Sequence, residues 1–363
     1  MVVQCYHGHN SDHKEKHMNI ENEQKTLMFK EAQETHSRVA LQLQSNRRKI
    51  EKLGDFLRDN PPAMVMTCGR GSSDHAATYA KYLIETHLAI PTLSVAPSIT
   101  SVFSVRQDLK NVIFLVISQS GQSPDILSAA ITAKESGAFL ISMVNDENSP
   151  LALVSNLVLP LHAGPEKSVA ATKSYICSLT AIAQLVAVWA QNKKLINALA
   201  TLPAALEKAF DQDWSGGMEM LKKEDNLFVV SRGLGLGIAQ EAALKFKETC
   251  GLHAEAFSAA EVKHGPMAIV KKGFPVLVFS LTDQSQDSID EAIHAFLDRS
   301  AQVLSVGNVY EGALNLNSDN SVAAELRPII FIQSFYKFVN ALSVARGYNP
   351  DCPPYLNKVT ETL

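Results

Sequence analysis

The sequence repeats one pattern of apolar runs and helical stretches, and this repeat constrains the fold more than any other feature. Arg70-Gly71 and Arg232-Gly233 lie 162 positions apart, and each pair follows a short apolar run and precedes a helical pattern. Ile117 and Ser280, which lie at the ends of apolar runs, are 163 positions apart. Similarity at a fixed offset is the signature of a repeated structural unit. We therefore predict two copies of one module.

Each copy alternates between candidate strands and candidate helices. The first copy contains four apolar runs that are typical of buried strands: Ala63–Cys68, Val112–Ile117, Phe139–Val144 and Leu157–Leu161. A helical pattern from about Thr26 to Leu57 precedes them. Strands that are separated by helices favour an α/β fold with a parallel sheet.

The length of 363 residues fits about two such domains. We predict a disordered, His-rich extension over residues 1–25 and a first domain over residues 26–200. A second domain is predicted over residues 201–347, with a linker near 199–214, and a C-terminal tail over residues 348–363.

Composition excludes several classes of function. The net charge is −4 and no run of Lys or Arg occurs, so a nucleic-acid partner is not expected. The start of the chain is polar, unlike a signal peptide, and the most apolar helical stretch, Tyr175–Ala190, is short for a membrane span. The five cysteines are scattered, which favours reduced thiols in the cytoplasm over a disulfide framework or a zinc site.

The loop Ser118–Ser123 is the clearest candidate for a binding site. It follows the apolar run Val112–Ile117 and precedes Pro124, a residue that is favoured in the first helical turn. Free backbone N–H groups and the helix dipole attract anions at such a position, and serine hydroxyls add donors. No Gly-Lys-Ser/Thr follows, so the loop suits one phosphate monoester and not a nucleotide. An ordinary serine-rich turn is the alternative.

The second copy lacks this loop and carries charged residues instead. Ser280–Ser285 replaces the serine loop and has lost its glycine. Glu241, Lys245 and Glu248 have the spacing i, i+4, i+7, which brings them to one face of a helix. The alternative for these three is an ion pair on the protein surface. His264, before Gly-Pro, is either structural or an acid/base group.

Five ordered segments then resemble one family. They are Gly71-Ser72-Ser73, Ser118–Ser123, Val169–Lys173, Glu241–Glu248 and Glu261–Pro266. Together they resemble the isomerase half of glucosamine-6-phosphate synthase, a tandem pair of sugar isomerase (SIS) domains. The resemblance implies two doubly wound, flavodoxin-like domains, each with a five-stranded parallel sheet flanked by helices. It also implies a homodimer with its sites near the subunit interface and a sugar phosphate as ligand. We expect no cofactor or metal, because a positioned carboxylate can carry the proton.

The resemblance also implies roles for particular residues. Glu248 would move a proton between C1 and C2 beside Lys245, and His264, which the partner subunit could contribute, would assist ring opening. Lys358, in the tail that closes the site, would approach the open-chain carbonyl. The residues implied to bind phosphate are Ser73, Ser118, Gln119, Ser120 and Ser123. The residues implied to contact the sugar are Gly71, Ser72, Glu166, Ala170 and Ala171, although Ala171 stands where the synthase tends to carry a hydroxyl.

About 60 residues precede the first predicted strand, too few for the synthase's glutaminase domain. We therefore expect the reverse reaction, deamination of glucosamine 6-phosphate to fructose 6-phosphate, and the pattern is similar to SIS-type deaminases. The alternatives are a galactosamine-6-phosphate deaminase, a fructosamine-6-phosphate deglycase, a simple aldose–ketose isomerase and a non-catalytic sugar-phosphate sensor.

Overall fold

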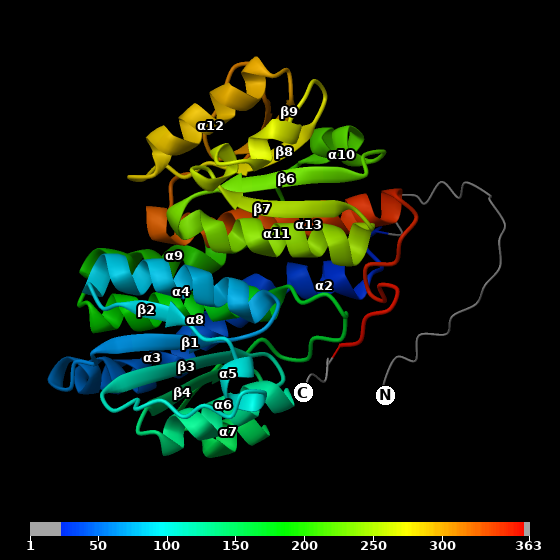
Figure 1. The fold of residues 1–363 in the computed structure, drawn as a ribbon. Helices are drawn as coiled ribbons and strands as arrows, with labels where there is room; N and C mark the ends of the chain where they lie inside the picture. The colour runs from blue at the N-terminus through cyan, green and yellow to red at the C-terminus, as the bar shows by residue number, and fades with distance from the viewer. Residues whose placement is uncertain (1–22, 359–363) are drawn as a thin grey trace.

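The protein consists of two parallel sheets with a thick layer of helices between them (Figure 1). The structure is a computed structural model and describes residues 23–358. The predicted extension over residues 1–25 therefore lies almost entirely outside the described part. The first sheet contains β1 (Met64–Cys68), β2 (Thr92–Ser94), β3 (Val112–Ser118), β4 (Phe139–Val144) and β5 (Leu157–Pro160). The second contains β6 (Asn226–Ser231), β7 (His253–Ser258), β8 (Pro275–Phe279), β9 (Gln302–Val306) and β10 (Leu314–Leu316).

Both sheets have the same topology. The first has the spatial order β2-β1-β3-β4-β5, and the second has the order β7-β6-β8-β9-β10 when its strands are taken from the same edge. Every strand pair is parallel. This order is that of a flavodoxin-like, doubly wound sheet, whose ligand crevice lies where the order reverses. The predicted repeat of one α/β module is confirmed.

Helices cover both faces of each sheet. The inner layer between the sheets contains α3 (Thr35–Asp59), α4 (Ser72–Leu88), α8 (Lys173–Trp189), α9 (Lys193–Phe210), α11 (Leu236–Cys250) and α13 (Arg327–Ala345). The outer face of the first sheet carries α5 (Ser98–Ser101), α6 (Pro124–Glu135) and α7 (Pro150–Val154), and that of the second carries α12 (Gln286–Asp298). The short helices α2 (Leu27–Gln33) and α10 (Ser215–Leu221) pack against α13.

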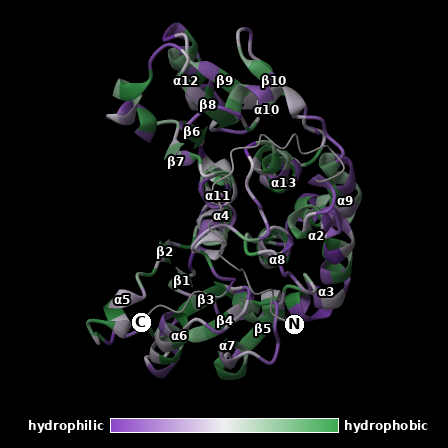
Figure 2. Ribbon diagram, turned by 90° about the vertical axis from the view of Figure 1, so that its right-hand side faces the viewer, coloured by the Kyte–Doolittle hydropathy of each residue, from purple (hydrophilic) through white to green (hydrophobic). Residues whose placement is uncertain are grey.

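The core follows the two-residue period of the strands. In β3, Ile113, Leu115 and Ile117 join the large central cluster between the sheets, whereas Phe114 and Val116 join the cluster under α6 and α7. The ribbon coloured by hydropathy shows apolar residues concentrated along these strands (Figure 2). A strand that is buried on both faces requires a continuous apolar run, and for this reason β3 is visible in the sequence.

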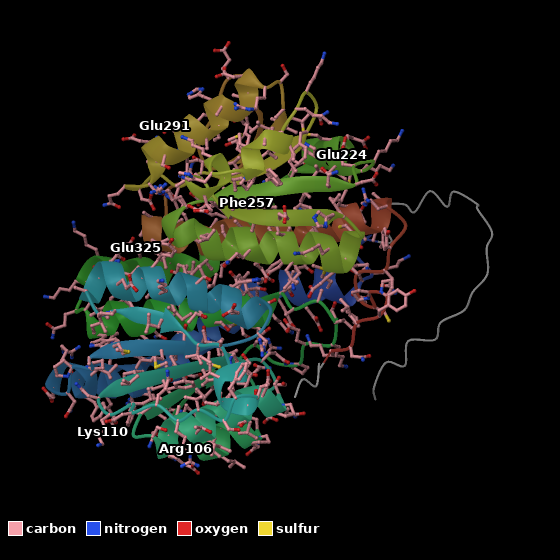
Figure 3. All side chains as sticks on the ribbon, in the orientation of Figure 1. Arg106, Lys110, Glu224, Phe257, Glu291 and Glu325 are labelled. Carbon is pink, nitrogen blue, oxygen red and sulfur yellow. The ribbon has the colours of Figure 1, made fainter. Side chains whose placement is uncertain are left out.

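The two domains are held together by helices that come from both. The predicted boundary between residues 200 and 201 falls within α9, which packs against α3 and α8 of the first domain and α13 of the second. Glu325 lies between the two halves (Figure 3), and its carboxylate pairs with His87 of α4 at 3.4 Å. α4 and α11 occupy equivalent positions in the repeat and also pack against each other.

Two expectations from composition are refined by the structure. Among the described residues, one helix, Ala324–Ala345, is long and apolar enough to span a membrane, but 83% of its most apolar window is buried inside the protein, as in a core helix.

Cys68, Cys177 and Cys250 are buried free thiols. The prediction of reduced thiols is wrong at Cys352, which is disulfide-bonded.

Candidate functional site

A pocket of about 370 Å³ lies at the carboxyl ends of β1 and β3, the position where the strand order of the first sheet reverses. Loops after parallel strands meet there, so residues that are far apart in sequence line one crevice. Most of the predicted site residues line the pocket: Gly71, Ser72, Ser73, Ser118, Gln119, Ser120, Ser123, Ala171 and Lys358.

The serine loop has the predicted local structure, a turn between a strand and a helix. It joins β3 to α6, and Pro124 is the first residue of that helix. Gly121 has a φ of +62°, and a Cβ there would approach Ser149 Oγ to 2.3 Å, so the turn requires glycine. Ser118 Oγ accepts the Gly121 N–H at 3.0 Å, which fixes the turn, while Ser123 makes no capping bond with its side chain.

Arg70 brings a positive charge to the pocket wall, and sequence reasoning missed this role. Its Nε and Nη2 donate to Asp125 Oδ2 at 3.0 and 2.7 Å. The Arg70 side chain is 54% exposed whereas that of Asp125 is buried, so the carboxylate orients a guanidinium at the pocket wall. In the sequence, Arg70 is recognisable only as part of the repeated Arg-Gly pair. Its ion-pair partner, Asp125, lies 55 residues later on α6, so nothing in the sequence indicates the contact.

Lys358 reaches the pocket from the C-terminal tail, as the resemblance implies. Its Nζ pairs at 3.2 Å with Glu166, whose side chain is fully buried. Glu166 also accepts bonds from the N–H groups of Thr172 and Ser174 and from Ser174 Oγ. Although burial raises the pKa of Glu166, Lys358 and these donors together hold it below its ordinary value. Glu166 does not itself line the pocket, so the structure places it behind Lys358.

The three charged residues of α11 form a buried cluster. Lys245 Nζ lies 3.2 Å from Glu241 and 2.6 Å from Glu248, and the side chains of Glu241 and Lys245 are at most 1% exposed. The alternative of a surface ion pair is therefore wrong. Burial would raise the pKa of Glu241, but Lys245, His75 and Ser72 lower it to about 2. Burial likewise opposes the charge on Lys245, yet the two carboxylates raise its pKa.

Ser72 connects this cluster to the pocket. Its hydroxyl donates to Glu241 at 3.1 Å and accepts from Lys245 at 3.2 Å, and Ser72 itself lines the pocket. Glu241 also accepts bonds from His75 at 3.1 Å and from Tyr336 at 3.0 Å. His75 and Tyr336 had no recognisable signal in the sequence, because they meet Glu241 only after α4, α11 and α13 pack together.

Five predicted residues do not line the pocket: Glu166, Ala170, Lys245, Glu248 and His264. Ala170 is buried beside it, and Glu248 reaches it only through Lys245 and Ser72. His264 lies in the second domain after the short helix Glu261–Lys263, and it is exposed. Within residues 23–358 no hydrogen bond or ion pair joins the His264 ring to the pocket. Its contribution from a partner subunit stays a prediction.

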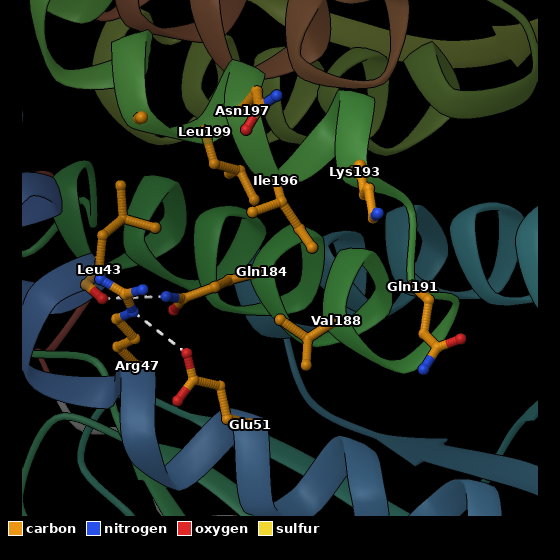
Figure 4. A pocket seen from close by; sticks show the side chains of 11 residues that line it. Leu43, Arg47, Glu51, Gln184, Val188, Gln191, Lys193, Ile196, Asn197 and Leu199 are labelled. Atoms are coloured by element: carbon orange, nitrogen blue, oxygen red, sulfur yellow. Dashed lines mark hydrogen bonds and ion pairs between the residues drawn. The ribbon is translucent and has the colours of Figure 1, made fainter.

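A second, larger cavity of about 800 Å³ lies between α3, α8 and α9 (Figure 4). Its walls include Leu43, Val188 and Ile196, and Arg47 pairs with Glu51 at 3.1 Å on its rim. None of the predicted site residues lines this cavity, so size alone does not identify the site here. In the described part of the chain no cluster of His, Cys, Asp or Glu could hold a metal ion.

Comparison with known proteins gives consistent matches. The family profile described as "SIS domain" matches residues 63–188 and 220–346. The glutamine–fructose-6-phosphate aminotransferase (isomerizing) of Aquifex aeolicus is 32% identical over 317 residues, which is 85% of this chain and 52% of that protein. The chain thus spans about half the length of the curated relatives it matches.

Solved structures extend these matches to three dimensions. A "putative phosphosugar isomerase" from Silicibacter pomeroyi is 40% identical, with a TM-score of 0.86, over 90% of this chain and 100% of that one. A glucosamine-6-phosphate deaminase from Thermotoga maritima has a TM-score of 0.66 over 90% of this chain and 100% of that one, but at 21% identity it shows the fold alone. The two profile matches coincide with the two sheets and their helices, and the chain therefore belongs to the SIS domain family.

Proposed function

We propose that the protein acts on a sugar phosphate and that it deaminates glucosamine 6-phosphate to fructose 6-phosphate and ammonia. The observation that carries this proposal is the composition of one pocket wall. An anion loop and Arg70 line the pocket together with the ammonium of Lys358, while Ser72 links its wall to the buried carboxylate–lysine cluster. A volume of about 370 Å³ suits one phosphorylated sugar.

In this proposal, the phosphate binds the free N–H groups and hydroxyls of the loop Ser118–Ser123 at the start of α6. Arg70 adds a charge-assisted contact, because Asp125 occupies only one side of its guanidinium. The sugar then extends from the phosphate toward Ser72 and Lys358.

The proton steps are assigned to the cluster on α11. After ring opening, Glu248 takes the proton from C2, and returning it to C1 gives an imine at C2. Water adds to this imine, the C–N bond breaks, and ammonia leaves with fructose 6-phosphate. Lys245 and Lys358 offset the negative charge that develops on the substrate oxygens, and His264 is assigned to ring opening.

The names of the relatives support this substrate class. The curated relatives are named for isomerisation and for amino transfer to fructose 6-phosphate, and the matched part is about half of each. Release of ammonia requires only water as a second reactant, which suits a pocket sized for one sugar phosphate.

The test is ammonia release from glucosamine 6-phosphate with parallel detection of fructose 6-phosphate, in the presence of EDTA. Galactosamine 6-phosphate is assayed alongside. Equimolar ammonia and fructose 6-phosphate from the first sugar alone would support the proposal. Interconversion of aldose and ketose phosphates without ammonia would replace it with a simple isomerase, and tight binding without turnover would replace it with a sensor.

A further inference from the structure

The C-terminal tail is fastened to the rest of the molecule at Asp351, seven residues before Lys358. We infer that Asp351 is a positioning residue for Lys358, and that its carboxylate fixes the path by which the lysine enters the pocket. The effect on catalysis rests on the proposed function, whereas the effect on the position of Lys358 does not.

The first contact joins the tail to α2. The two carboxylate oxygens of Asp351 accept the N–H groups of Leu27 at 2.7 Å and Met28 at 2.8 Å. These two N–H groups belong to the first turn of the helix, where no backbone carbonyl can accept them. One oxygen takes each N–H, so both oxygens are used, and asparagine could replace only one of them.

The second contact joins the tail to the loop that carries Glu166. The carbonyl of Asp351 accepts the Val169 N–H at 3.1 Å, and the preceding carbonyl of Pro350 accepts Ser168 Oγ at 3.5 Å. The same loop is bound from α2, because Glu31 accepts the N–H groups of Lys167 and Ser168. The start of α2, the loop and the tail therefore hold one another in place.

The contacts of Asp351 determine how the tail that carries Lys358 approaches the pocket. Residues 354–357 are exposed, so the anchor at Asp351 determines where the tail leaves the protein surface and turns toward the pocket. At the far end, Lys358 meets Glu166, which lies on the loop that Asp351 also holds. A shift of the tail relative to this loop would separate the lysine from its carboxylate and move its amine within the pocket.

The competing explanation is that Asp351 only stabilises a helix. Asp213 is a matched control, because its carboxylate accepts the N–H of Ser215 at 2.9 Å at the start of α10, in the second domain. Losing either carboxylate removes a contact to helix N–H groups, but only Asp351 is linked to the tail that carries Lys358.

The experiment compares Asp351→Ala and Asp213→Ala in the full chain, with dithiothreitol present so that the Cys352 disulfide does not hold the tail. Reductive methylation followed by mass spectrometry measures how fast the amine of Lys358 reacts. We expect a several-fold faster reaction at Lys358 in Asp351→Ala and no change in Asp213→Ala, since the wild-type side chain is only 25% exposed and its amine is bound to Glu166. Asp351→Asn, which keeps one acceptor, should give an intermediate rate and serves if the alanine variant does not fold.

Activity measurements distinguish a role of Asp351 in positioning Lys358 from a role in stability alone. With glucosamine 6-phosphate we expect kcat of Asp351→Ala to fall by about 10- to 100-fold, with a smaller change in KM, because a reacting group is displaced. In a Lys358→Ala background the same change should leave kcat unaltered. Equal losses in both backgrounds, or an unchanged methylation rate at Lys358, would overturn the inference. Faster methylation in a protein without deaminase activity would uphold it while rejecting the proposed function.

Discussion

At the scale of single residues, the two glutamates of α11 differ in burial and in the number of hydrogen bonds that they accept. Glu241 accepts bonds from four side chains and is fully buried, so it stays ionised and orders its neighbours. Among residues 23–358 the only ion-pair partner of Glu248 is Lys245, and the Glu248 side chain is 20% exposed. The base is assigned to Glu248 on the family resemblance, and its partial exposure, unlike the full burial of Glu241, suits a group that moves a proton.

Glu248→Gln should retain sugar-phosphate binding and lose turnover. The amide keeps the size of the side chain and can still accept from Lys245, but it cannot take a proton. We expect kcat to fall by about 10²–10⁴-fold with little change in the affinity measured by calorimetry. Glu291→Gln, which alters a 71% exposed surface partner of Lys263, is the control and should be active. Normal turnover of Glu248→Gln would remove this residue from the mechanism.

Ser120→Ala should weaken binding more than turnover. Its hydroxyl lines the pocket within the anion loop, and hydrogen bonds to a charged group contribute about 1.5–3 kcal/mol. We expect KM for the sugar phosphate to rise by about tenfold or more at nearly constant kcat. Ser285→Ala alters the corresponding loop of the second domain, where Asp283 already accepts the serine hydroxyl, and should leave KM unchanged. An unchanged KM in Ser120→Ala would count against the phosphate loop.

The sequence predicted the structure of the loop Ser118–Ser123 because all its residues are adjacent and their conformation is local. It could not predict Arg70 as part of the pocket, nor the bonds from His75 and Tyr336 to Glu241, because those contacts exist only between elements that are distant in the chain. The positions of Glu166 and Lys358 came from the family resemblance, since a lysine near a C-terminus is ordinarily a solvated side chain.

At the scale of elements, the site is assembled where α4 meets α11. Ser72 and His75 lie in the first turns of α4, and both bind Glu241 of α11. The two helices approach closely at Gly237, where a Cβ would lie 2.6 Å from the carbonyl oxygen of His75. The absence of a side chain at this position therefore sets the spacing of α4 and α11.

Gly237→Ala should impair both folding and activity. A methyl group cannot fit 2.6 Å from a backbone oxygen, so the helices must move apart at a cost of about 1–3 kcal/mol. We expect a melting temperature several degrees lower and a reduced kcat, because Ser72 and His75 would move away from Glu241. Gly216→Ala is the matched helical control, since its Cβ would meet only Leu314 side-chain atoms at 3.7 Å. Equal stability of the two variants would contradict a close crossing.

Prediction of the strands succeeded where an apolar run marks the strand and failed where the sequence contains no such run. β3 and β4 are buried on both faces, and their apolar runs gave their positions almost to the residue. β7 is an edge strand of mixed burial with the sequence His253–Ser258, and β2 and β10 have only three residues each. Such strands are formed by pairing with their neighbours and leave no apolar run in the sequence.

At the scale of the whole molecule, charged groups buried between segments make stability depend on pH. Glu31 of α2 binds the loop that carries Glu166. Burial is the main cause that raises its pKa from 4.5 to about 6 in the folded protein. Protonation of Glu31 therefore favours the folded state, and this contribution is fully present below about pH 4.5 and is lost as the pH rises through about 6.

Comparison of the wild type with Glu31→Gln should isolate this effect. The amide does not titrate, so the difference in melting temperature between the two proteins should shift in favour of the wild type as the pH falls from about 7.5 to about 5. Measurements at several pH values in one buffer series test this expectation. A difference that does not change with pH would mean that Glu31 keeps an ordinary pKa in the folded protein.

The close crossing at Gly237 also has a consequence for the history of the chain. His75 and Gly237 are 162 positions apart, the offset of the repeat, so each helix meets the other at the equivalent place. Two identical copies with histidine at both places could not approach so closely, whereas copies that had diverged there could. If the halves descend from one duplicated ancestor, at least one copy must have carried glycine at this place before the two helices could cross as they do now.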